Sequence, residues 1–419
     1  MKNIKIGFVG LTHLGLNYLA ATAQKKYSVI GIDADDKIIE KLDKNLIENK
    51  EPNLRNLILK NRKKILFSSQ FKQLKECQII FISQDVNTDK KGRSDLKSLR
   101  KLINTTLKNL NKKSILVILS QMKPGFIRSI NFPKSRLYYQ VETLIFGKAI
   151  NRALLPERII IGCENKLTKI NPVYMKYLKK FHCPIIKMKY ESAEVAKISI
   201  NLLLASSVTT TNILSELCEK VSADWQDIIP ALKLDKRIGK FSYIKPGLGI
   251  AGGNIERDIV TVRNVLTKNQ PPFLILKDIL DNSDYMKDWV KRLLNKKNFL
   301  NKKKVNIGVV GATYKENTNS IKNSPALKLI NYLKNKNSIS IYEPLVNLSL
   351  KSKNIKQVKS LTHLIKNNKI IIFMRPWSNN KEINSKYEIL KKKIIIDPYR
   401  VIDQQKKFKK NNYFTLGKS

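Results

Sequence analysis

Two side chains on one predicted helix could together assist the oxidation of an alcohol. Residues 192–221 carry apolar side chains at helical spacing without glycine or proline, which predicts one long helix. Lys197 and Asn201 lie four residues apart in it, so both project from one face. A lysine can take up the proton of an alcohol as a hydride leaves, and an amide can stabilise the oxygen anion. The same spacing is common on solvated helix faces, so the pair alone leaves both interpretations open.

A glycine-rich turn near the N-terminus predicts a dinucleotide site. The first predicted strand runs into Gly-Leu-Thr-His-Leu-Gly, residues 10–15, and the next strand ends in an acid. Such a turn places a pyrophosphate at the start of a helix, and the acid binds the ribose and repels a 2′-phosphate, which favours NAD over NADP. Glycine-rich turns also serve packing alone, and here Thr12 replaces the middle glycine. The predicted cofactor contacts are Gly10, Thr12, His13, Leu14, Gly15 and Asp33.

These side chains require a scaffold of alternating strands and helices. Short β-branched runs alternate with segments of helical period, and the alternation restarts after a Lys/Asn-rich linker; this predicts parallel, doubly wound sheets. We therefore expect an α/β protein in which two Rossmann-like doubly wound domains are joined by a long central helix and a helical segment that includes residues 272–297. The predicted strands are residues 4–10, 28–33, 79–83, 114–120, 158–162, 305–311, 338–343, 369–374 and 393–397.

Composition narrows the class of protein. A chain of 419 residues exceeds what one core usually supports, and 80 Lys+Arg against 33 Asp+Glu give a formal net charge of +47. The basic residues are dispersed without interleaved aromatics, so an AT-rich coding bias explains them better than nucleic-acid binding does. The four cysteines and three histidines show no metal-ligand spacing, so no metal is expected. With no secretory leader or apolar stretch of membrane-spanning length recognised, we expect a soluble, cytoplasmic protein without membrane insertion.

An ordered series of motifs covers nearly the whole chain. Besides residues 10–15 and the Lys197/Asn201 pair, it comprises Glu51-Pro52-Asn53-Leu54, Ser120 with Pro124-Gly125, Glu142–Gly147 with Pro156-Glu157-Arg158, the glycine-rich loop Pro246–Asp258, Tyr314-Lys315 with Thr318 and Ser324-Pro325-Ala326, and Asp397 with Arg400. In this order the motifs resemble those of the UDP-glucose/GDP-mannose dehydrogenase family. The resemblance implies NAD-dependent oxidation of a nucleotide sugar at C6, from alcohol through aldehyde to acid, by two hydride transfers at one site.

The resemblance also implies a domain plan, a substrate and an assembly. Residues 1–190 would form the NAD-binding Rossmann domain, residues 191–298 the central helical and dimerisation domain, and residues 299–419 the C-terminal nucleotide-sugar-binding Rossmann-like domain. The simplest substrate is UDP-glucose or a related UDP-hexose, whose uronic acid would feed polysaccharide synthesis. Such enzymes are usually homodimers or higher homo-oligomers, formed through the long helix.

The family's catalytic roles carry over by position. Lys197 would assist proton removal, Asn201 would bind the C6 oxygen, and Asp258 would hold the catalytic water or the lysine. Glu142 stands where the family has an acid–base glutamate. The catalytic set implied in this way is Glu142, Lys197, Asn201, Asn254 and Asp258.

The substrate contacts follow from the same motifs. Gly249 and Gly252 would let the backbone approach the sugar, and Lys315 and Arg400 suit a diphosphate or carboxylate by charge. Tyr243 precedes the loop and either stacks on the substrate's base or ribose or packs internally. The implied substrate-binding residues are Glu142, Lys197, Asn201, Tyr243, Gly249, Gly252, Arg257, Lys315 and Arg400, and the implied further cofactor contacts are Ser120 and Lys315.

One departure from the family bears directly on the chemistry. Asn254 stands where the family's loop has a cysteine nucleophile, which forms a thiohemiacetal that is then oxidised to a thioester. Asparagine supplies no thiolate. Phe146 and Gln121 replace an acid and a threonine. Three interpretations stay open: full oxidation with water replacing the thiol, a single two-electron oxidation, or a weak or inactive nucleotide-sugar-binding paralogue.

Overall fold

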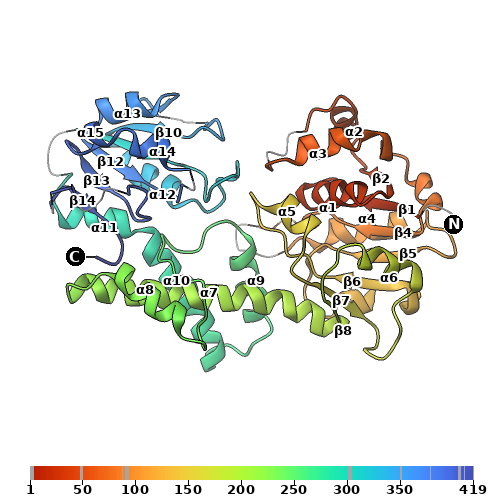
Figure 1. The fold of residues 1–419 in the computed structure, drawn as a ribbon. Coiled ribbons are helices and arrows are strands. Elements are labelled where there is room, and N and C mark those ends of the chain that lie inside the picture. Colours follow the sequence, from red (N-terminus) through yellow and green to blue (C-terminus); the bar gives the residue numbers. More distant parts are fainter. Residues whose placement is uncertain are drawn as a thin grey trace. The chain divides into compact units, whose positions relative to one another are not determined.

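The chain folds into two compact units, residues 1–200 and residues 201–419, each with its own sheet (Figure 1). The computed structural model describes residues 4–47, 51–86, 88–89, 94–300, 304–349, 352–377, 379–403, 407–409 and 411–418. The α/β class predicted from the sequence is confirmed, whereas the division into three domains stays a prediction.

The first sheet has the strand order β3-β2-β1-β4-β5-β6-β7-β8. Its pairs are parallel except β6 with β7, where Tyr139 lies opposite Gly162 in an antiparallel register. The sequence predicted a parallel sheet throughout, so this pair is a correction, and strands β3, β6 and β8 were not predicted. The strands are β1 Lys5–Val9, β2 Ser28–Ile32, β3 Ile65–Ser68, β4 Ile79–Ile82, β5 Ile115–Ile118, β6 Leu137–Gln140, β7 Ile159–Cys163 and β8 Ile185–Lys189.

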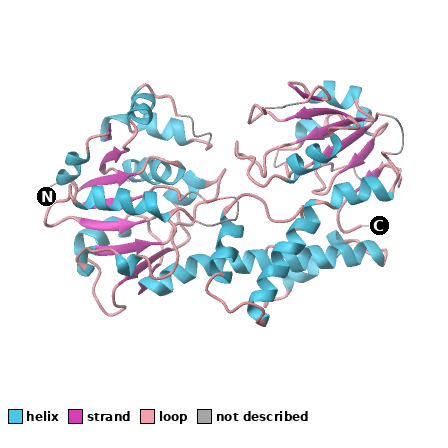
Figure 2. Cartoon of the chain, turned by 180° about the vertical axis from the view of Figure 1, so that it is seen from behind, coloured by secondary structure: helices cyan, strands magenta, loops and turns pink. Residues whose placement is uncertain are grey.

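Helices cover both faces of this sheet, as Figure 2 also shows. Helices α1, α2, α3, α5 and α6 pack on one face, and α4 packs on the other together with the first turn of α7. Because both faces are buried, β4 and β5 are apolar at every position, as parallel strands of this class usually are. The helices are α1 His13–Gln24, α2 Asp36–Asp43, α3 Leu54–Lys60, α4 Leu96–Leu107, α5 Ala149–Leu154 and α6 Pro172–Lys179, with 3-10 turns at Arg62–Lys64, Phe71–Glu76, Ile127–Ser129 and Lys134–Arg136.

The long helix α7 spans Tyr190–Lys220, close to the predicted residues 192–221. By length and composition it could also cross a membrane, with a mean hydropathy of 1.2 in its most apolar window, although the sequence analysis expected no such stretch. One such helix among the described residues is a weak indication, because helices of soluble cores pass the same test. Helix α7 therefore does not by itself show that the chain spans a membrane.

The second unit begins with helices and ends with the second sheet. Helices α10 and α11 meet at Asp288, where the sequence predicted one continuous helical stretch. Strand order is β11-β10-β9-β12-β13-β14, and every pair is parallel. The elements are α8 Trp225–Leu234, α9 Asn254–Arg263, α10 Pro271–Lys287, α11 Trp289–Lys296, β9 Asn306–Val310, α12 Pro325–Leu333, β10 Ser338–Tyr342, β11 Ile355–Val358, α13 Leu361–Asn367, β12 Ile370–Phe373, α14 Lys381–Asn384, α15 Tyr387–Leu390, β13 Ile394–Ile396 and β14 Tyr413–Phe414.

The second sheet repeats the first in its central strand order. In both sheets the first strand lies in the middle, the next two follow on one side, and the remaining strands follow on the other. In doubly wound proteins, ligands bind at the carboxyl ends of the strands where the strand order reverses. Helices α10, α11 and α12 pack on one face of the second sheet, and α13, α14 and α15 pack on the other.

Candidate functional site

The turn between β1 and α1 is built around two glycines that the packing requires. Gly10 has φ +92°, and a Cβ on it would lie 2.6 Å from the Cβ of Gln84. A Cβ on Gly15 would lie 2.0 Å from the carbonyl oxygen of Gly10. Both positions therefore exclude a side chain, and the turn exposes backbone where the dinucleotide pattern predicts a pyrophosphate.

Asp33 is held directly beside this turn. Its carboxylate accepts hydrogen bonds from the N–H of Leu11 at 2.8 Å and from the N–H of Asp35 at 3.1 Å. The N–H of Gly10 donates to the carbonyl of Ile32 at 2.9 Å, which ties the turn to the end of β2. The predicted ribose acid thus lies where β2 ends, next to the glycine turn.

The start of α1 is also bonded to the turn that follows β4. Thr12, at the N-cap, donates its hydroxyl to the carbonyl of Ser83 at 3.3 Å and accepts from the N–H of Asp85 at 2.9 Å. The Asp85 carboxylate accepts from the N–H of Leu14 at 3.2 Å. Ser120, at the end of β5, is buried and donates to the carbonyl of Gln84 at 2.7 Å. Threonine in place of the middle glycine therefore joins two loops at the predicted cofactor site.

His13, at the first position of α1, forms part of a partly buried cluster. Its Nε2 lies 3.0 Å from Glu51 Oε2, and its ring stacks on Phe146 with centroids 4.0 Å apart. Glu51 also accepts from the N–H groups of Gly147 and Ala149 at 2.9 and 2.8 Å. Burial raises the pKa of Glu51, but the hydrogen bond from His13 and those from the two N–H groups outweigh it and hold the pKa below its usual value. Glu51 thus fixes the segment that follows Glu142.

Glu142 and Lys197 form a nearly buried ion pair. Lys197 Nζ lies 2.7 Å from Glu142 Oε1, and the two side chains are 9% and 13% exposed. Lys197 Nζ also donates to the backbone carbonyl of Glu142 at 3.0 Å, and the second carboxylate oxygen accepts from the N–H of Leu144 at 2.9 Å. The structure therefore brings together two residues that the sequence placed 55 positions apart.

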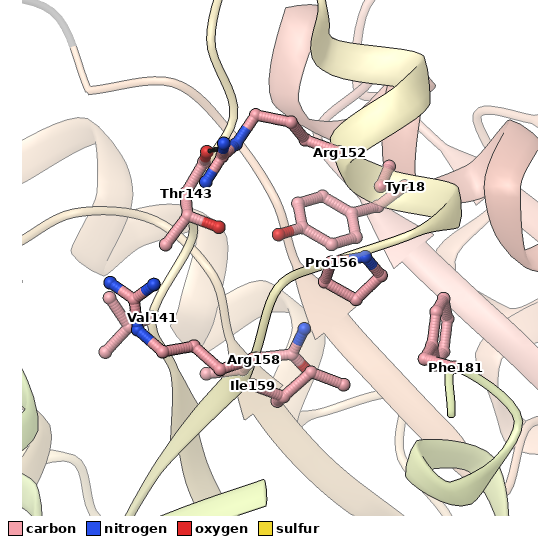
Figure 3. A pocket seen from close by; sticks show the side chains of 10 residues that line it. Tyr18, Val141, Thr143, Arg152, Pro156, Arg158, Ile159 and Phe181 are labelled. Carbon is pink, nitrogen blue, oxygen red and sulfur yellow. Dashed lines mark hydrogen bonds between the residues drawn. The ribbon is translucent and has the colours of Figure 1, made fainter. Parts of the chain in front are cut away.

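A small hollow lies beside the segment that carries Glu142 (Figure 3). Tyr18 of α1 points its hydroxyl toward Thr143 there, and Arg152 of α5 donates to the carbonyl of Thr143 at 2.7 Å. Burial, and next the nearby carboxylate of Glu142, raise the pKa of Tyr18 far above its usual value. Tyr18 thus remains neutral and supports the segment by packing and hydrogen bonding. The sequence analysis did not identify Tyr18 or Arg152.

Glu194, one turn before Lys197 on α7, anchors the Pro124-Gly125 motif. Its carboxylate accepts from the N–H of Gly125 at 2.7 Å and from the N–H of Ile127 at 3.0 Å. The side chain is buried, and burial raises its pKa despite these two hydrogen bonds. The sequence analysis missed Glu194, although its spacing of three residues from Lys197 places it on the same side of the helix.

In the second unit, Asn201 is bonded to the predicted catalytic aspartate. Asn201 Nδ2 donates to Asp258 Oδ2 at 2.5 Å, and the residues are 9% and 2% exposed. Arg257 is also buried, and its Nε lies 3.5 Å from Asp258 Oδ1. Asn254 is the first residue of α9 and is exposed within the described part of the chain. The unit thus presents a buried amide–carboxylate–guanidinium cluster, with Asn254 one turn before Asp258.

Gly249 and Gly252 of the glycine-rich loop lie so close to the backbone of Ser283 and the ring of Tyr314 that neither position has room for a side chain. Gly249 has φ +74°, and a Cβ on it would lie 2.3 Å from the carbonyl oxygen of Ser283. Gly252 has φ +86°, and a Cβ there would lie 3.0 Å from the ring of Tyr314. The packing of this unit therefore already requires both glycines, which is a structural reason independent of a sugar.

Side chains from other elements hold the loop in shape. The N–H of Gly247 donates to Asn212 at 2.9 Å, that of Leu248 to the hydroxyl of Tyr399 at 3.2 Å, and that of Ile250 to the hydroxyl of Ser283 at 2.8 Å. These bonds fix the path of the loop into α9. The sequence analysis did not find these anchors because each lies far from the loop along the chain.

The remaining predicted substrate residues differ in their surroundings. The Arg400 guanidinium donates two hydrogen bonds to the Asp224 carboxylate, at 2.6 and 3.2 Å. Arg400 is therefore already bonded within its own unit. Burial raises the pKa of Asp224. The hydrogen bonds from Arg400 and from the N–H of Gln226 lower it by more, so the pKa of Asp224 lies below its usual value. Lys315 Nζ lies 5.6 Å from the centroid of the Tyr314 ring. Tyr243 is 58% exposed.

The turn after β9 repeats the geometry of the turn after β1. Gly311 has φ +89°, and its N–H donates to the carbonyl of Tyr342 at 2.9 Å. Glu343, directly after β10, accepts from the N–H groups of Ala312 and Thr313 at 2.9 and 3.0 Å, as Asp33 does from Leu11. The second unit therefore carries its own strand, glycine turn and terminal acid.

Comparison with known proteins identifies all three segments of the chain. The NAD binding domain of the UDP-glucose/GDP-mannose dehydrogenase family matches residues 4–182, its central domain matches residues 191–284, and its UDP binding domain matches residues 308–404. The chain belongs to the UDP-glucose/GDP-mannose dehydrogenase family. The resemblance inferred from the motifs is confirmed, and so is NAD as the cofactor.

Relatives of this family member are distant but similar over nearly their full length. UDP-glucose 6-dehydrogenase of Rickettsia conorii is 27% identical over 431 residues, covering 96% of both chains. UDP-glucose 6-dehydrogenase TuaD of Bacillus subtilis is 26% identical over 421 residues, covering 96% of this chain and 89% of its own.

Solved structures show the same fold. The UDP-glucose dehydrogenase of Pyrobaculum islandicum has a TM-score of 0.85 at 19% identity, covering 99% of this chain and 98% of that one. The UDP-D-ManNAc dehydrogenase of Pyrococcus horikoshii has a TM-score of 0.82 at 20% identity, covering 99% of each chain. Similarity at this level of identity establishes the fold, and family membership supports a nucleotide-sugar dehydrogenase.

The thiol that the family's second oxidation would use has no counterpart in this loop. Residues 246–258 contain no cysteine. Cys77, Cys163 and Cys218 are buried and Cys183 is partly buried, and burial raises the pKa of all four, that of Cys77 to about 12. A thiol with a raised pKa is a poor nucleophile at neutral pH. The roles assigned to individual site residues stay predictions.

Proposed function

We propose that this chain oxidises the C6 hydroxyl of a nucleotide sugar with NAD, and that the substrate is UDP-glucose or a related UDP-hexose. The observation that carries the proposal is the buried Glu142–Lys197 ion pair. A charged pair with side chains 9% and 13% exposed costs desolvation energy, so its presence calls for a functional explanation. In a member of this family, the oxidation of an alcohol would be that functional explanation.

The proposed roles follow from the bonds that each side chain makes. Bound NAD would accept the hydride from C6. Lys197 is paired with a carboxylate and therefore acts best as an ammonium group, which stabilises the negative charge that develops on the C6 oxygen. Glu142 is within reach of the lysine and would receive the proton, directly or through water. Lys197 thus assists proton removal, as the family resemblance implies.

Asn201 and Asp258 would act as a second polar pair. Asn201 donates to Asp258 through Nδ2, which leaves its carbonyl oxygen oriented by that bond. Asn201 follows Lys197 by four positions in α7. We propose that Asn201 binds the C6 oxygen and that Asp258 holds the water that the second oxidation consumes.

Asn254 favours a second candidate, which is a single two-electron oxidation. Alcohol and one NAD give aldehyde, one NADH and one proton; the acid requires water, a second NAD and the release of a second NADH. Without a thiol, the second step depends on hydration of the aldehyde, and a slow hydration would leave the aldehyde as the main product. A weak or inactive nucleotide-sugar-binding paralogue is the third outcome of the same test.

The experiment counts NADH formed per sugar consumed across a panel of nucleotide sugars. Absorbance at the NADH band gives the electron count, and mass spectrometry distinguishes aldehyde from acid. Two NADH per sugar support full oxidation, one supports the single step, and none with any sugar refutes the dehydrogenase. The variant Asn254→Cys should raise the share of acid if the missing thiol limits the second step, with Asn254→Ser as the control that changes size without supplying a comparable nucleophile.

The biological setting is part of the proposal. A uronic acid product would serve polysaccharide precursor synthesis, and we propose a cytoplasmic homodimer or higher homo-oligomer formed through α7. Size-exclusion chromatography with light scattering tests the assembly. A monomer at micromolar concentration would contradict this part and leave the proposed chemistry standing.

A further inference from the structure

The anion-binding end of α1 already holds a carboxylate of the protein itself. The N–H of Leu14, the second residue of α1, donates to Asp85 Oδ2 at 3.2 Å. The first N–H groups of a helix have no partner within the helix, and together with the helix dipole they attract negative charge. These are the groups that a dinucleotide pyrophosphate uses at a glycine turn.

Asp85 is placed there by the residue that departs from the glycine pattern. The hydroxyl of Thr12 accepts from the N–H of Asp85 at 2.9 Å and donates to the carbonyl of Ser83 at 3.3 Å. A glycine at position 12 would supply neither bond. The aspartate side chain is exposed, so its rotation away from Leu14 requires no repacking of the core.

We propose that Asp85 is a determinant of cofactor affinity, whose carboxylate competes with the NAD pyrophosphate for the start of α1. On binding, the pyrophosphate replaces the Asp85 carboxylate at the N–H of Leu14. The displaced carboxylate still lies near the phosphates, and like charges repel. The inference rests on NAD binding at this turn, which the family's NAD binding domain supports, and does not depend on which sugar is oxidised.

Removal of the charge should tighten binding. Asp85→Asn keeps an oxygen that can accept from Leu14 but carries no charge. Two unit charges a few ångströms apart at an exposed position are worth about a fivefold change in the dissociation constant. We expect Asp85→Asn to lower the Kd for NAD and for ADP-ribose by about fivefold at low ionic strength, and to leave the Kd for adenosine unchanged because adenosine has no phosphate.

Salt separates this electrostatic effect from a purely structural one. The Debye length shortens from about 30 Å at 0.01 M to about 3 Å at 1 M salt, so the difference between wild type and variant should shrink as salt increases. The matched control is Glu76→Gln, which removes one charge beside Lys5 at the start of β1, the opposite end of that strand from the glycine turn. It should leave both Kd values unchanged.

The measurement is isothermal titration of the full chain with NAD, ADP-ribose and adenosine at 0.05 and 0.5 M salt. Because the readout is binding, a failure to oxidise any sugar does not affect it. Asp85→Ser, which keeps a short uncharged cap, repeats the test if the asparagine variant folds poorly. Equal Kd values for wild type and variants at low salt, or a change that salt does not reduce, would overturn the proposal.

Discussion

Breaking the Glu142–Lys197 pair from one side should destabilise the first unit strongly. The charged atoms are 2.7 Å apart and both side chains are nearly buried. At an effective dielectric constant of about 20 the Coulomb attraction at this distance is about 6 kcal/mol, and desolvation of the two charges offsets a large part of it. Removal of one partner leaves the other charge buried, which typically costs about 3 kcal/mol.

The perturbations are Glu142→Gln, Lys197→Met and the double variant. For a unit of about 200 residues, a loss of about 3 kcal/mol lowers Tm by about 6 to 12 °C. The double variant removes both charges, so its Tm should lie above that of at least one single variant. Both single variants should also lose most NADH formation, since Glu142 is proposed to receive the alcohol proton and Lys197 to stabilise the charge on the C6 oxygen.

The assay is thermal unfolding by circular dichroism, with the transition of the first unit identified by its shift on addition of NAD. Asp43→Asn serves as the control, because Asp43 forms an ion pair of 2.8 Å with Arg62 in the same unit and the two side chains are 48% and 35% exposed. Its Tm should be unchanged. Shifts of less than about 2 °C in all three variants would refute the reasoning, because they would correspond to a loss of stability of at most about 1 kcal/mol. Fully additive shifts would refute it too, because they would mean that the two side chains are not coupled.

Three further predictions follow from single positions. Gly10→Ala should abolish NAD binding and lower Tm more than Gly125→Ala does. Both glycines have positive φ, but only a Cβ at position 10 would meet other atoms. Equal losses of Tm in the two variants would contradict the steric argument. Glu51→Gln should flatten the pH dependence of stability below about pH 4.5. The folded protein lowers the pKa of Glu51, so this carboxylate stabilises the fold fully above its pKa in the unfolded chain, and the stabilisation is lost as the pH falls through its pKa in the folded protein. An unchanged slope of stability between about pH 2.5 and 5 would count against this. Arg400→Ala and Asp224→Asn should each lower the unfolding temperature of the second unit, and their double variant should be no worse than the poorer single variant; fully additive losses would show that the two side chains are not paired.

Local pattern was enough to predict most of the elements near the site. The central strands β1, β2, β4 and β5 are short apolar runs between helical segments, and β9, β10, β12 and β13 repeat that pattern. The glycine turn and Asp33 follow from the order of strand, turn, helix and strand. Strands β6 and β11 are as short as β4 and β5, but they were missed because neither has the unbroken run of apolar residues that marks those two strands.

The partners of the site residues could not be predicted, because they lie far away along the chain. Glu142 and Lys197 are separated by 55 residues, Thr12 and Asp85 by 73, and Arg400 and Asp224 by 176. A sequence pattern reports what a residue type can do within one element. Which carboxylate reaches which cation is decided when the elements pack.

By itself the sequence determined the α/β class, the glycine turn at residues 10–15, the cofactor and the residues Lys197 and Asn201 on one helix face, because each follows from a local pattern. Only the tertiary structure decided that β6 and β7 are antiparallel, that Glu142 and Lys197 form a buried pair, and that Asp85 caps α1. Those features depend on how distant segments are brought together, and the free energy that selects them comes from burial and pairing of the whole unit rather than from local preference.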